Sequence, residues 1–177
     1  LRLCFEKVSG KDLNWFFNQW YFGSGHPKLN YSYTFEPVKK QVTVIINQSQ
    51  ELPFEFPLTI DVYDNGQPKR QQVWVNAAAK NTFTFDVSKN PDLVNINADG
   101  ILVADVTENK TPEQNLMQFT KSKELKSRYN ALNAIKDQVG KSPAATKLLS
   151  AALKDPYFRV REKALELMDL SNAEQLK

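Results

Sequence analysis

The chain has 177 residues, of which 41% are hydrophobic and 24% are charged, and its net charge at pH 7 is +3. These proportions are typical of soluble globular proteins, and the length suits one ordinary domain or two small ones. The basic residues are scattered along the sequence, which argues against a nucleic-acid-binding surface. A single cysteine, Cys4, excludes an internal disulfide, and a single histidine, His26, excludes a metal site with several histidine ligands.

The sequence contains no apolar run that approaches the roughly 18–20 residues needed to span a bilayer. Its first residues also lack the charged and then apolar layout of a signal peptide. The chain starts at Leu1 rather than at Met, so we expect it to be a piece of a longer protein. We expect a soluble bacterial protein and leave its compartment open between the cytoplasm and the periplasm.

Residues 1–22 are predicted to end a helical unit. Ser9 and Asp12 have the spacing of a capping-box-like helix start, and Gly23 marks the helix end. Between them, apolar residues recur at the spacing of one helical face, and they are Leu13, Phe16, Phe17, Trp20 and Tyr21. Trp15 and Phe22 widen this surface, which therefore needs a large partner. That partner is either the core of the present fold or a domain outside this chain.

Seven segments between residues 29 and 106 have the apolar alternation or short apolar runs of β-strands, with turn residues about every 8–12 positions. They are 29–35, 42–46, 56–62, 73–75, 83–87, 94–96 and 102–106. The pattern predicts an antiparallel β-sandwich of the immunoglobulin-like size class. Asn65-Gly66 predicts a tight hairpin. Pro53, before the third segment, and Pro57, near its start, predict an edge strand or a bend there.

Residues 111–177 are predicted to be helical. Thr111-Pro112 and Ser142-Pro143 are helix starts, a further helix is predicted from about 122 to 139, and Asp155-Pro156 opens the last one. The sequence repeats itself here, because the run that starts at Arg128 matches the run that starts at Arg161. Two helices per repeat predict an α-solenoid of the HEAT or armadillo type.

A search for catalytic chemistry finds few candidates. Ser24 and His26 are close in sequence, but this spacing alone does not make a catalytic dyad. Cys4 is interpreted as a buried small hydrophobic residue. Two groups of oxygen ligands are possible Ca²⁺ sites, although turn chemistry explains each of them as well. These groups are Asp61, Asp64 and Asn65, and Asn97, Asp99 and Asp105.

Residues 5–20 read FEKVSGKDLNWFFNQW, and residues 25–29 read GHPKL. These segments resemble the aminopeptidase N family of zinc metallopeptidases, the gluzincins. In that family a helix of the type S-G-x-D-L-x-x-F-F-x-Q-W ends the thermolysin-like catalytic domain, and a G-x-P turn leads into a β-sandwich and then a helical-repeat domain. Residues 97–102 stand where eukaryotic members have a G-aromatic-aromatic-R strand, which suggests a bacterial-type branch. Over residues 30–177 the resemblance is one of architecture only.

The family's zinc motif, H-E-x-x-H, and its G-x-M-E-N motif do not occur in this sequence. No catalytic or metal-binding residue of the family therefore carries over to this chain. The resemblance implies that zinc belongs to a catalytic domain that precedes Leu1. It also implies an interdomain packing role for one set of residues, namely Trp15, Phe16, Phe17, Trp20, Tyr21 and Pro27.

The sequence thus predicts an α+β, multi-domain chain. With the resemblance, residues 1–27 are expected to be the terminal helix of the thermolysin-like catalytic domain, residues 28–109 the immunoglobulin-like antiparallel β-sandwich, and residues 110–177 the start of the HEAT/armadillo-like helical repeats. We expect an accessory part of an aminopeptidase, with the catalytic domain and the peptide substrates as its partners. The alternative is a non-enzymatic scaffold or a protein- or glycan-binding module, for which Trp74 is the first candidate contact.

Overall fold

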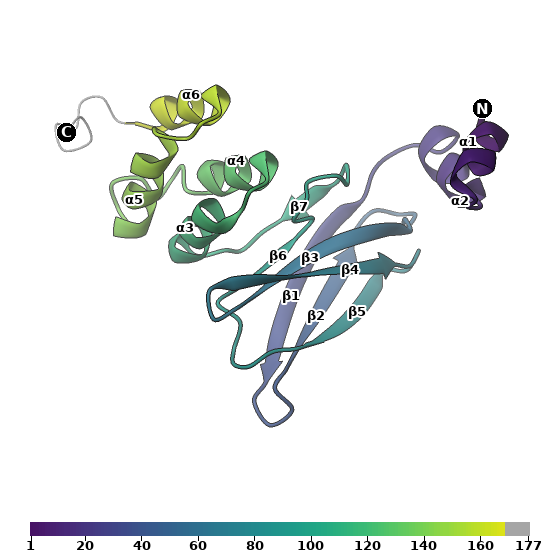
Figure 1. Ribbon diagram of the computed structural model, residues 1–177, viewed down its shortest axis with the longest axis horizontal. Helices are drawn as coiled ribbons and strands as arrows, with labels where there is room; N and C mark the ends of the chain where they lie inside the picture. Colours follow the sequence, from purple (N-terminus) through teal and green to yellow (C-terminus); the bar gives the residue numbers. More distant parts are fainter. Residues whose placement is uncertain (169–177) are drawn as a thin grey trace.

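The computed structural model describes residues 1–168 and has an α+β fold in three parts (Figure 1). Short helices at the N-terminus lie at one end of a pair of β-sheets, and a second group of helices, later in the chain, lies beside the sheets, where α3 contacts β6. The N-terminal helices are α1 (Arg2–Ser9), α2 (Asn14–Phe16) and the π-helical turn η1 (Phe17–Tyr21). None of the helices within these residues is long and apolar enough to cross a membrane.

The N-terminal segment contains a break that the sequence pattern did not reveal. Helix α1 ends because Gly10 adopts a left-handed conformation, with φ of 67°, and its N–H donates to the Glu6 carbonyl oxygen. Ser9 is therefore the last residue of α1, and the predicted helix start at Ser9 is wrong. The next helix begins at Asn14, whose N–H donates to Asp12 Oδ1 at 2.8 Å.

The β-part has seven strands within the described residues, close to the seven predicted segments. The strands are β1 (Lys28–Glu36), β2 (Gln41–Gln48), β3 (Phe56–Asp64), β4 (Gln67–Val75), β5 (Lys80–Asp86), β6 (Leu93–Ile96) and β7 (Asp105–Thr107). One sheet has the order β5-β2-β1-β7 and the other the order β4-β3-β6. The prediction of a wholly antiparallel arrangement is wrong for β7, which pairs with β1 in parallel because the chain crosses from one sheet to the other after β6.

The two sheets share one hydrophobic core. Alternate residues of β2 face it, and Val42, Val44 and Ile46 have no exposed surface. The opposite sheet contributes residues such as Leu58 and Ile60 to the same core. Apolar residues at every second position of a strand thus lie on one face of the sheet and are buried between the two sheets.

The predicted hairpin and the predicted position of the third segment have different outcomes. Asn65 and Gly66 have φ of 55° and 71°, which confirms the tight hairpin between β3 and β4. Of the two alternatives predicted for the third segment, the edge strand is wrong for β3 as a whole, because β3 is the central strand of its sheet, and the bend stays a prediction. Pro57 is tolerated because β6 pairs only with residues 60–63 of β3, so that β3 has β4 as its only strand partner at Pro57.

The C-terminal helices are α3 (Pro112–Lys121), α4 (Leu125–Ala134), α5 (Pro143–Ala152) and α6 (Phe158–Leu167). The capping box of Thr111 and Gln114 is confirmed, and Ser142 caps α5. Helix α4 ends before the predicted residue 139. Helix α6 begins three residues after Asp155, because the Asp155 carboxylate accepts from the N–H of Tyr157 and holds a turn there. Residues 169–177 of the predicted helical domain lie outside the described residues.

The sequence repeat is also a repeat of contacts. Arg128 and Arg161 each donate from Nη1 to the carbonyl oxygen of the residue five places earlier, at 2.7 and 3.0 Å. The alanines three residues after each arginine, Ala131 and Ala164, have no exposed surface. The matching runs therefore occupy equivalent positions in two successive helix pairs.

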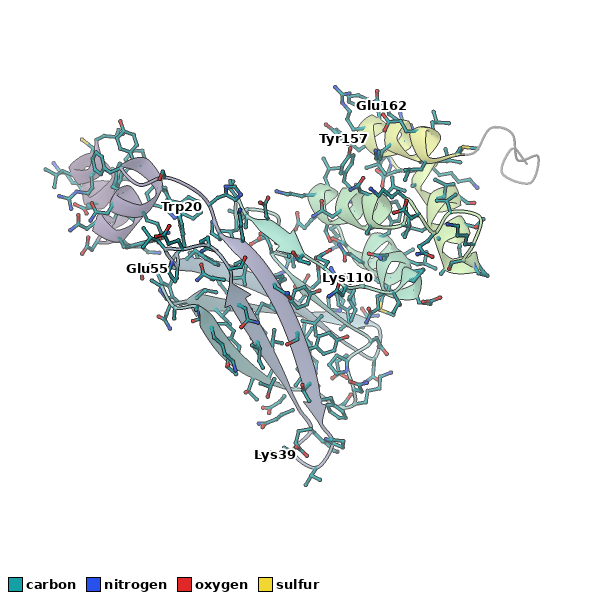
Figure 2. The ribbon with its side chains drawn as sticks, turned by 180° about the vertical axis from the view of Figure 1, so that it is seen from behind. Trp20, Lys39, Glu55, Lys110, Tyr157 and Glu162 are labelled. Atoms are coloured by element: carbon teal, nitrogen blue, oxygen red, sulfur yellow. The ribbon has the colours of Figure 1, made fainter. Side chains whose placement is uncertain are left out.

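A buried cation joins the sheets to the C-terminal helices. Lys110, labelled in Figure 2, has only 3% of its side chain exposed. Its Nζ donates to Asn95 Oδ1 of β6 at 2.7 Å, to Glu108 Oε1 at 2.7 Å and to Gln118 Oε1 of α3 at 2.6 Å. Burial lowers the pKa of Lys110, while the Glu108 carboxylate acts in the opposite direction. Because these contacts cross residue 109, the predicted domain boundary there stays a prediction.

Replacing Lys110 by Met should lower the free energy of unfolding by about 3–5 kcal/mol, because it leaves the Glu108 carboxylate without its cation in a buried site. Urea denaturation followed by circular dichroism measures this change. The control is Lys136→Met, which removes the same charge from an exposed position and should change stability by less than about 0.5 kcal/mol. Equal effects of the two substitutions would contradict the assigned role of Lys110.

Asp64 should make stability depend on acid. Hydrogen bonds from Lys69, and then from Ser88, lower the pKa of the buried Asp64 carboxyl to about 2. A carboxyl whose pKa is lowered by folding stabilises the folded state above its ordinary value of 3.8. That stabilisation is lost as the pH falls toward 2. The Asp64→Asn variant should therefore be less stable than the parent chain at neutral pH, and denaturation midpoints should converge as the pH falls. A constant difference across this range would refute the assignment.

Candidate interdomain site at the N-terminal joint

The six residues predicted to pack between domains differ in how much of each is buried. Phe17 and Pro27 are buried, Trp15 and Trp20 are half-buried, and Phe16 and Tyr21 are exposed by 42% and 64%. The predicted aromatic face is therefore not a single surface. One side of it contacts the strands, and the other side faces outward.

The strand-facing side holds the N-terminal helices to the sheets. The Trp15 ring lies edge-on to Trp74 of β4, with centroids 4.9 Å apart, and Trp20 contacts Phe54 at 5.1 Å. The Gln19 side chain accepts from Glu55 N–H and donates to the Glu55 carbonyl oxygen, both at 2.8 Å. This pair of hydrogen bonds fixes the position of η1 against the segment before β3.

Trp74 thus has a structural contact in this joint. It was the first candidate for glycan binding, because it lies on the strand face opposite Val73 and Val75. Its side chain is 42% exposed, but its ring packs against Trp15. The contact gives Trp74 a packing role within the chain, and the glycan-binding hypothesis gains no further support.

A π-helical turn interrupts the predicted aromatic face. The α-helical spacing predicted from Leu13 to Tyr21 is interrupted, because Phe22 N–H donates to the Phe17 carbonyl oxygen at 2.9 Å, which is π-helical pairing. A π turn takes one residue more than an α turn, so the residues after it are rotated away from the expected face. Tyr21, at the end of the turn, and Phe22, directly after it, are 64% and 73% exposed.

The outward side is continuous with α1, which buries none of its residues. Ring contacts of 5.1–6.3 Å connect Phe5, Phe17, Tyr21 and Phe22 in succession. We name the exposed set the N-terminal apolar surface, which consists of Leu1, Leu3, Phe5, Val8, Phe16, Tyr21 and Phe22. Single exposed apolar residues are common, whereas several of them on one short segment make a candidate interaction site.

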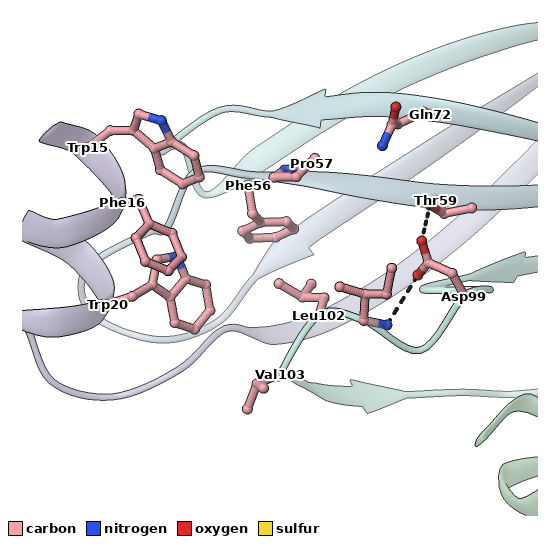
Figure 3. A pocket seen from close by; sticks show the side chains of 11 residues that line it. Trp15, Phe16, Trp20, Phe56, Pro57, Thr59, Gln72, Asp99, Leu102 and Val103 are labelled. Atoms are coloured by element: carbon pink, nitrogen blue, oxygen red, sulfur yellow. Dashed lines mark hydrogen bonds between the residues drawn. The ribbon is translucent and has the colours of Figure 1, made fainter. Parts of the chain in front are cut away.

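A groove lies where the N-terminal helices meet the second sheet and the loop after β6 (Figure 3). Its volume is about 400 Å³, within the range of ligand pockets. We name it the joint groove, and its lining consists of Trp15, Phe16, Trp20, Phe56, Pro57, Thr59, Gln72, Asp99, Ile101, Leu102 and Val103. Figure 3 shows the aromatic rings at one end and Asp99 with Thr59 at the other.

The polar end of the joint groove is built on the Asp99 carboxylate. Its Oδ2 accepts from Thr59 Oγ1 at 2.5 Å, and its Oδ1 accepts from the N–H of Ile101 at 3.2 Å. Within residues 1–168, no lysine or arginine nitrogen lies within 4 Å of this carboxylate. The sequence pattern gave Asp99 only a turn role or a Ca²⁺ role, because nothing local reveals that Thr59 faces it across the sheet.

The residues of the two possible Ca²⁺ groups have other partners in the structure. Asp61 is paired with Arg70 through both carboxylate oxygens, at 2.9 and 3.0 Å, and Asp64 is held by Lys69 and Ser88. In the second group, the Asn97 amide bonds the backbone of Leu102. No group of three or more His, Cys, Asp or Glu residues that could hold a metal occurs in the described part of the chain.

The remaining candidates have simple surroundings. His26 Nε2 lies 2.8 Å from Asp105 Oδ2, and this hydrogen bond lowers the pKa of the Asp105 carboxyl. Ser24 is exposed in the turn before it. Cys4 is also exposed, so its interpretation as a buried residue is wrong. Its position on α1 explains the error, because that helix contributes nothing to the core.

Comparison with known proteins finds a similar fold among solved structures. No protein-family model matches the chain, and no curated protein matches it. Among solved structures, the crystal structure of Legionella pneumophila aminopeptidase A in complex with aspartic acid is similar, with a TM-score of 0.72 and 20% sequence identity. The alignment covers 99% of this chain and 22% of that chain. This chain therefore has the fold of a segment of that aminopeptidase, and it spans less than a quarter of the aminopeptidase's length.

Proposed function

We propose that this chain is a non-catalytic, accessory portion of a bacterial aminopeptidase N-type zinc enzyme, which removes N-terminal residues from peptides. The fold likeness to a segment of an aminopeptidase supports this, together with the family-like run at residues 5–29. In this proposal the paired sheets are an immunoglobulin-like sandwich. The α3–α6 segment is the start of a HEAT- or armadillo-like domain, which the repeated arginine contacts support.

The observation that carries the proposal is the N-terminal apolar surface. Leu3 and Phe22 are 70% and 73% exposed, and α1 has only eight residues with no core of its own. Isolated helices of this length are marginal in water, so α1 needs tertiary contacts. A catalytic domain that packs on this surface would supply them. Trp15 and Trp20 then face the strands, while Phe16 and Tyr21 face the catalytic domain.

The role of the chain is then to hold two elements at fixed positions. The Gln19–Glu55 hydrogen bonds fix the helix next to the catalytic domain, and the Lys110 contacts fix the C-terminal helices. A rigid body between them would support the catalytic domain and place helices where they limit peptide access.

The zinc of the proposed enzyme is assigned to the catalytic domain. Residues 1–168 contain no group of three or more His, Cys, Asp or Glu side chains that could hold a metal ion. The single histidine of the chain, His26, is hydrogen-bonded to Asp105. In such enzymes zinc activates a water molecule for attack on the peptide carbonyl. We derive no catalytic step from the residues of this chain.

The first test extends the polypeptide toward its N-terminus. A coding sequence upstream of Leu1 that contains H-E-x-x-H should yield a protein that binds zinc and hydrolyses aminoacyl-anilides. Replacing the glutamate of that motif should abolish hydrolysis. An upstream sequence without the motif, together with no hydrolysis, would overturn the enzyme proposal and favour the scaffold alternative.

A second test uses the exposed surface itself. The substitutions Leu3→Ser and Phe22→Ser should lower the melting temperature of the extended protein by several degrees, because each removes apolar contact with the catalytic domain. In the chain of residues 1–177 they should leave the melting temperature nearly unchanged. Val38→Ser is the control, since Val38 is 90% exposed at the β1–β2 hairpin and should be neutral in both proteins. Equal effects in the two proteins would contradict the assigned interface.

A further inference from the structure

We infer that the joint groove is the docking site for an arginine-bearing segment of the catalytic domain. An apolar side chain of that segment occupies the aromatic end, and the guanidinium of the segment's arginine pairs with Asp99. This inference deepens the proposed function and rests on it for the identity of the partner. The inference is based on the position of the Asp99 carboxylate, which has no cationic partner within residues 1–168, beside an open apolar groove.

The aromatic end is built for an apolar side chain. Trp15, Phe16 and Trp20 line it from the helices, and Phe56 lines it from β3 (Figure 3). The rim is also apolar, with Ile101 exposed by 80% and Val103 by 68%. Covering this end removes apolar surface from water on both sides of the contact, which is the main source of binding free energy.

The acidic end lacks a cation, unlike the other recessed aspartates. The buried aspartates within residues 1–168 each have a lysine or arginine partner, and these pairs are Asp61–Arg70, Asp64–Lys69 and Asp155–Arg128. Asp99 has only Thr59 and a backbone N–H as donors. Each carboxylate oxygen can accept a further hydrogen bond, so the site remains open for a cationic donor.

Arginine fits this end better than lysine does. Its planar guanidinium can pair with both carboxylate oxygens at once, and it is less strongly hydrated than an ammonium group. It also stacks on aromatic rings, which the neighbouring part of the groove provides. Gln72, at the same polar part of the lining, adds an amide oxygen that can accept a hydrogen bond.

The partner is assigned to the catalytic domain because the groove and the N-terminal apolar surface are continuous. Phe16 belongs to both, and its ring contacts Trp15 inside the groove and Phe17 beside it. A domain that covers the apolar surface therefore reaches the groove. The carboxylate then fixes the register of docking, since a misplaced segment would leave Asp99 covered and unpaired.

The test uses two short peptides that differ only in charge. N-acetyl-Leu-Arg-amide carries the guanidinium, and the same peptide with citrulline is its neutral isostere. NMR titration of the 177-residue chain, read at the indole N–H signals of Trp15 and Trp20, gives both dissociation constants. The arginine peptide should bind about tenfold more tightly, as expected for a charge-assisted hydrogen bond.

Two variants locate the selectivity. Asp99→Asn should make the two peptides bind equally, whereas Asp86→Asn removes the same charge from an exposed position on β5 and should leave the ratio unchanged. The ratio on the unmodified chain needs no variant, so the test survives if Asp99→Asn fails to fold. Equal binding to the unmodified chain would overturn the inference. So would an unchanged ratio in Asp99→Asn, or no signal change up to about 20 mM peptide.

The outcome is distinguishable from that of the proposed function. Charge-selective binding to the isolated chain does not require a zinc motif upstream of Leu1. Hydrolysis by the extended protein, conversely, does not require that the groove bind the arginine peptide more tightly than the citrulline peptide. If hydrolysis is found without selectivity, only the docking inference fails. If selectivity is found without the zinc motif, the groove keeps its arginine preference but loses the catalytic domain as its partner, and the inference in its full form is overturned.

Discussion

The placement of one buried charge determines how the two halves of this protein meet. The Lys110 ammonium needs three acceptors once water is removed, and it finds them in β6, in the segment after β7 and in α3. The same network extends to α4, because Gln118 donates to the Ser127 carbonyl oxygen and Asn95 donates to the Ser127 hydroxyl. An apolar contact would tolerate sliding of the helices along the sheet. A buried cation with directional acceptors does not, so it selects one arrangement.

The N-terminal joint is built differently and has a different consequence. It relies on aromatic edges and on one glutamine that pairs with the backbone of Glu55. These contacts use only one side of the helical segment. The other side, with the joint groove beside it, remains available to a partner. The chain thus has one joint closed by internal polar contacts and one joint whose outward side is exposed.

Local sequence patterns predicted most of the strands and helix starts, because alternation and capping depend on neighbouring residues. Asn65-Gly66 and Thr111 to Gln114 behaved as their local chemistry requires. The parallel pairing of β7 could not be predicted in this way, since it depends on a crossover between sheets. Nor could the joint groove, because Thr59 and Asp99 are 40 residues apart and meet only through the fold.

The π-helical turn has an evolutionary implication. A π turn differs from an α turn by one residue, so a single insertion or deletion between Phe17 and Tyr21 is enough to interconvert them. Such a change would rotate the rings that follow it by about 100° around the helix axis while leaving those rings themselves the same. Related proteins could therefore exchange inward-facing and outward-facing aromatics here through an altered length, and an alignment without gaps would conceal the difference.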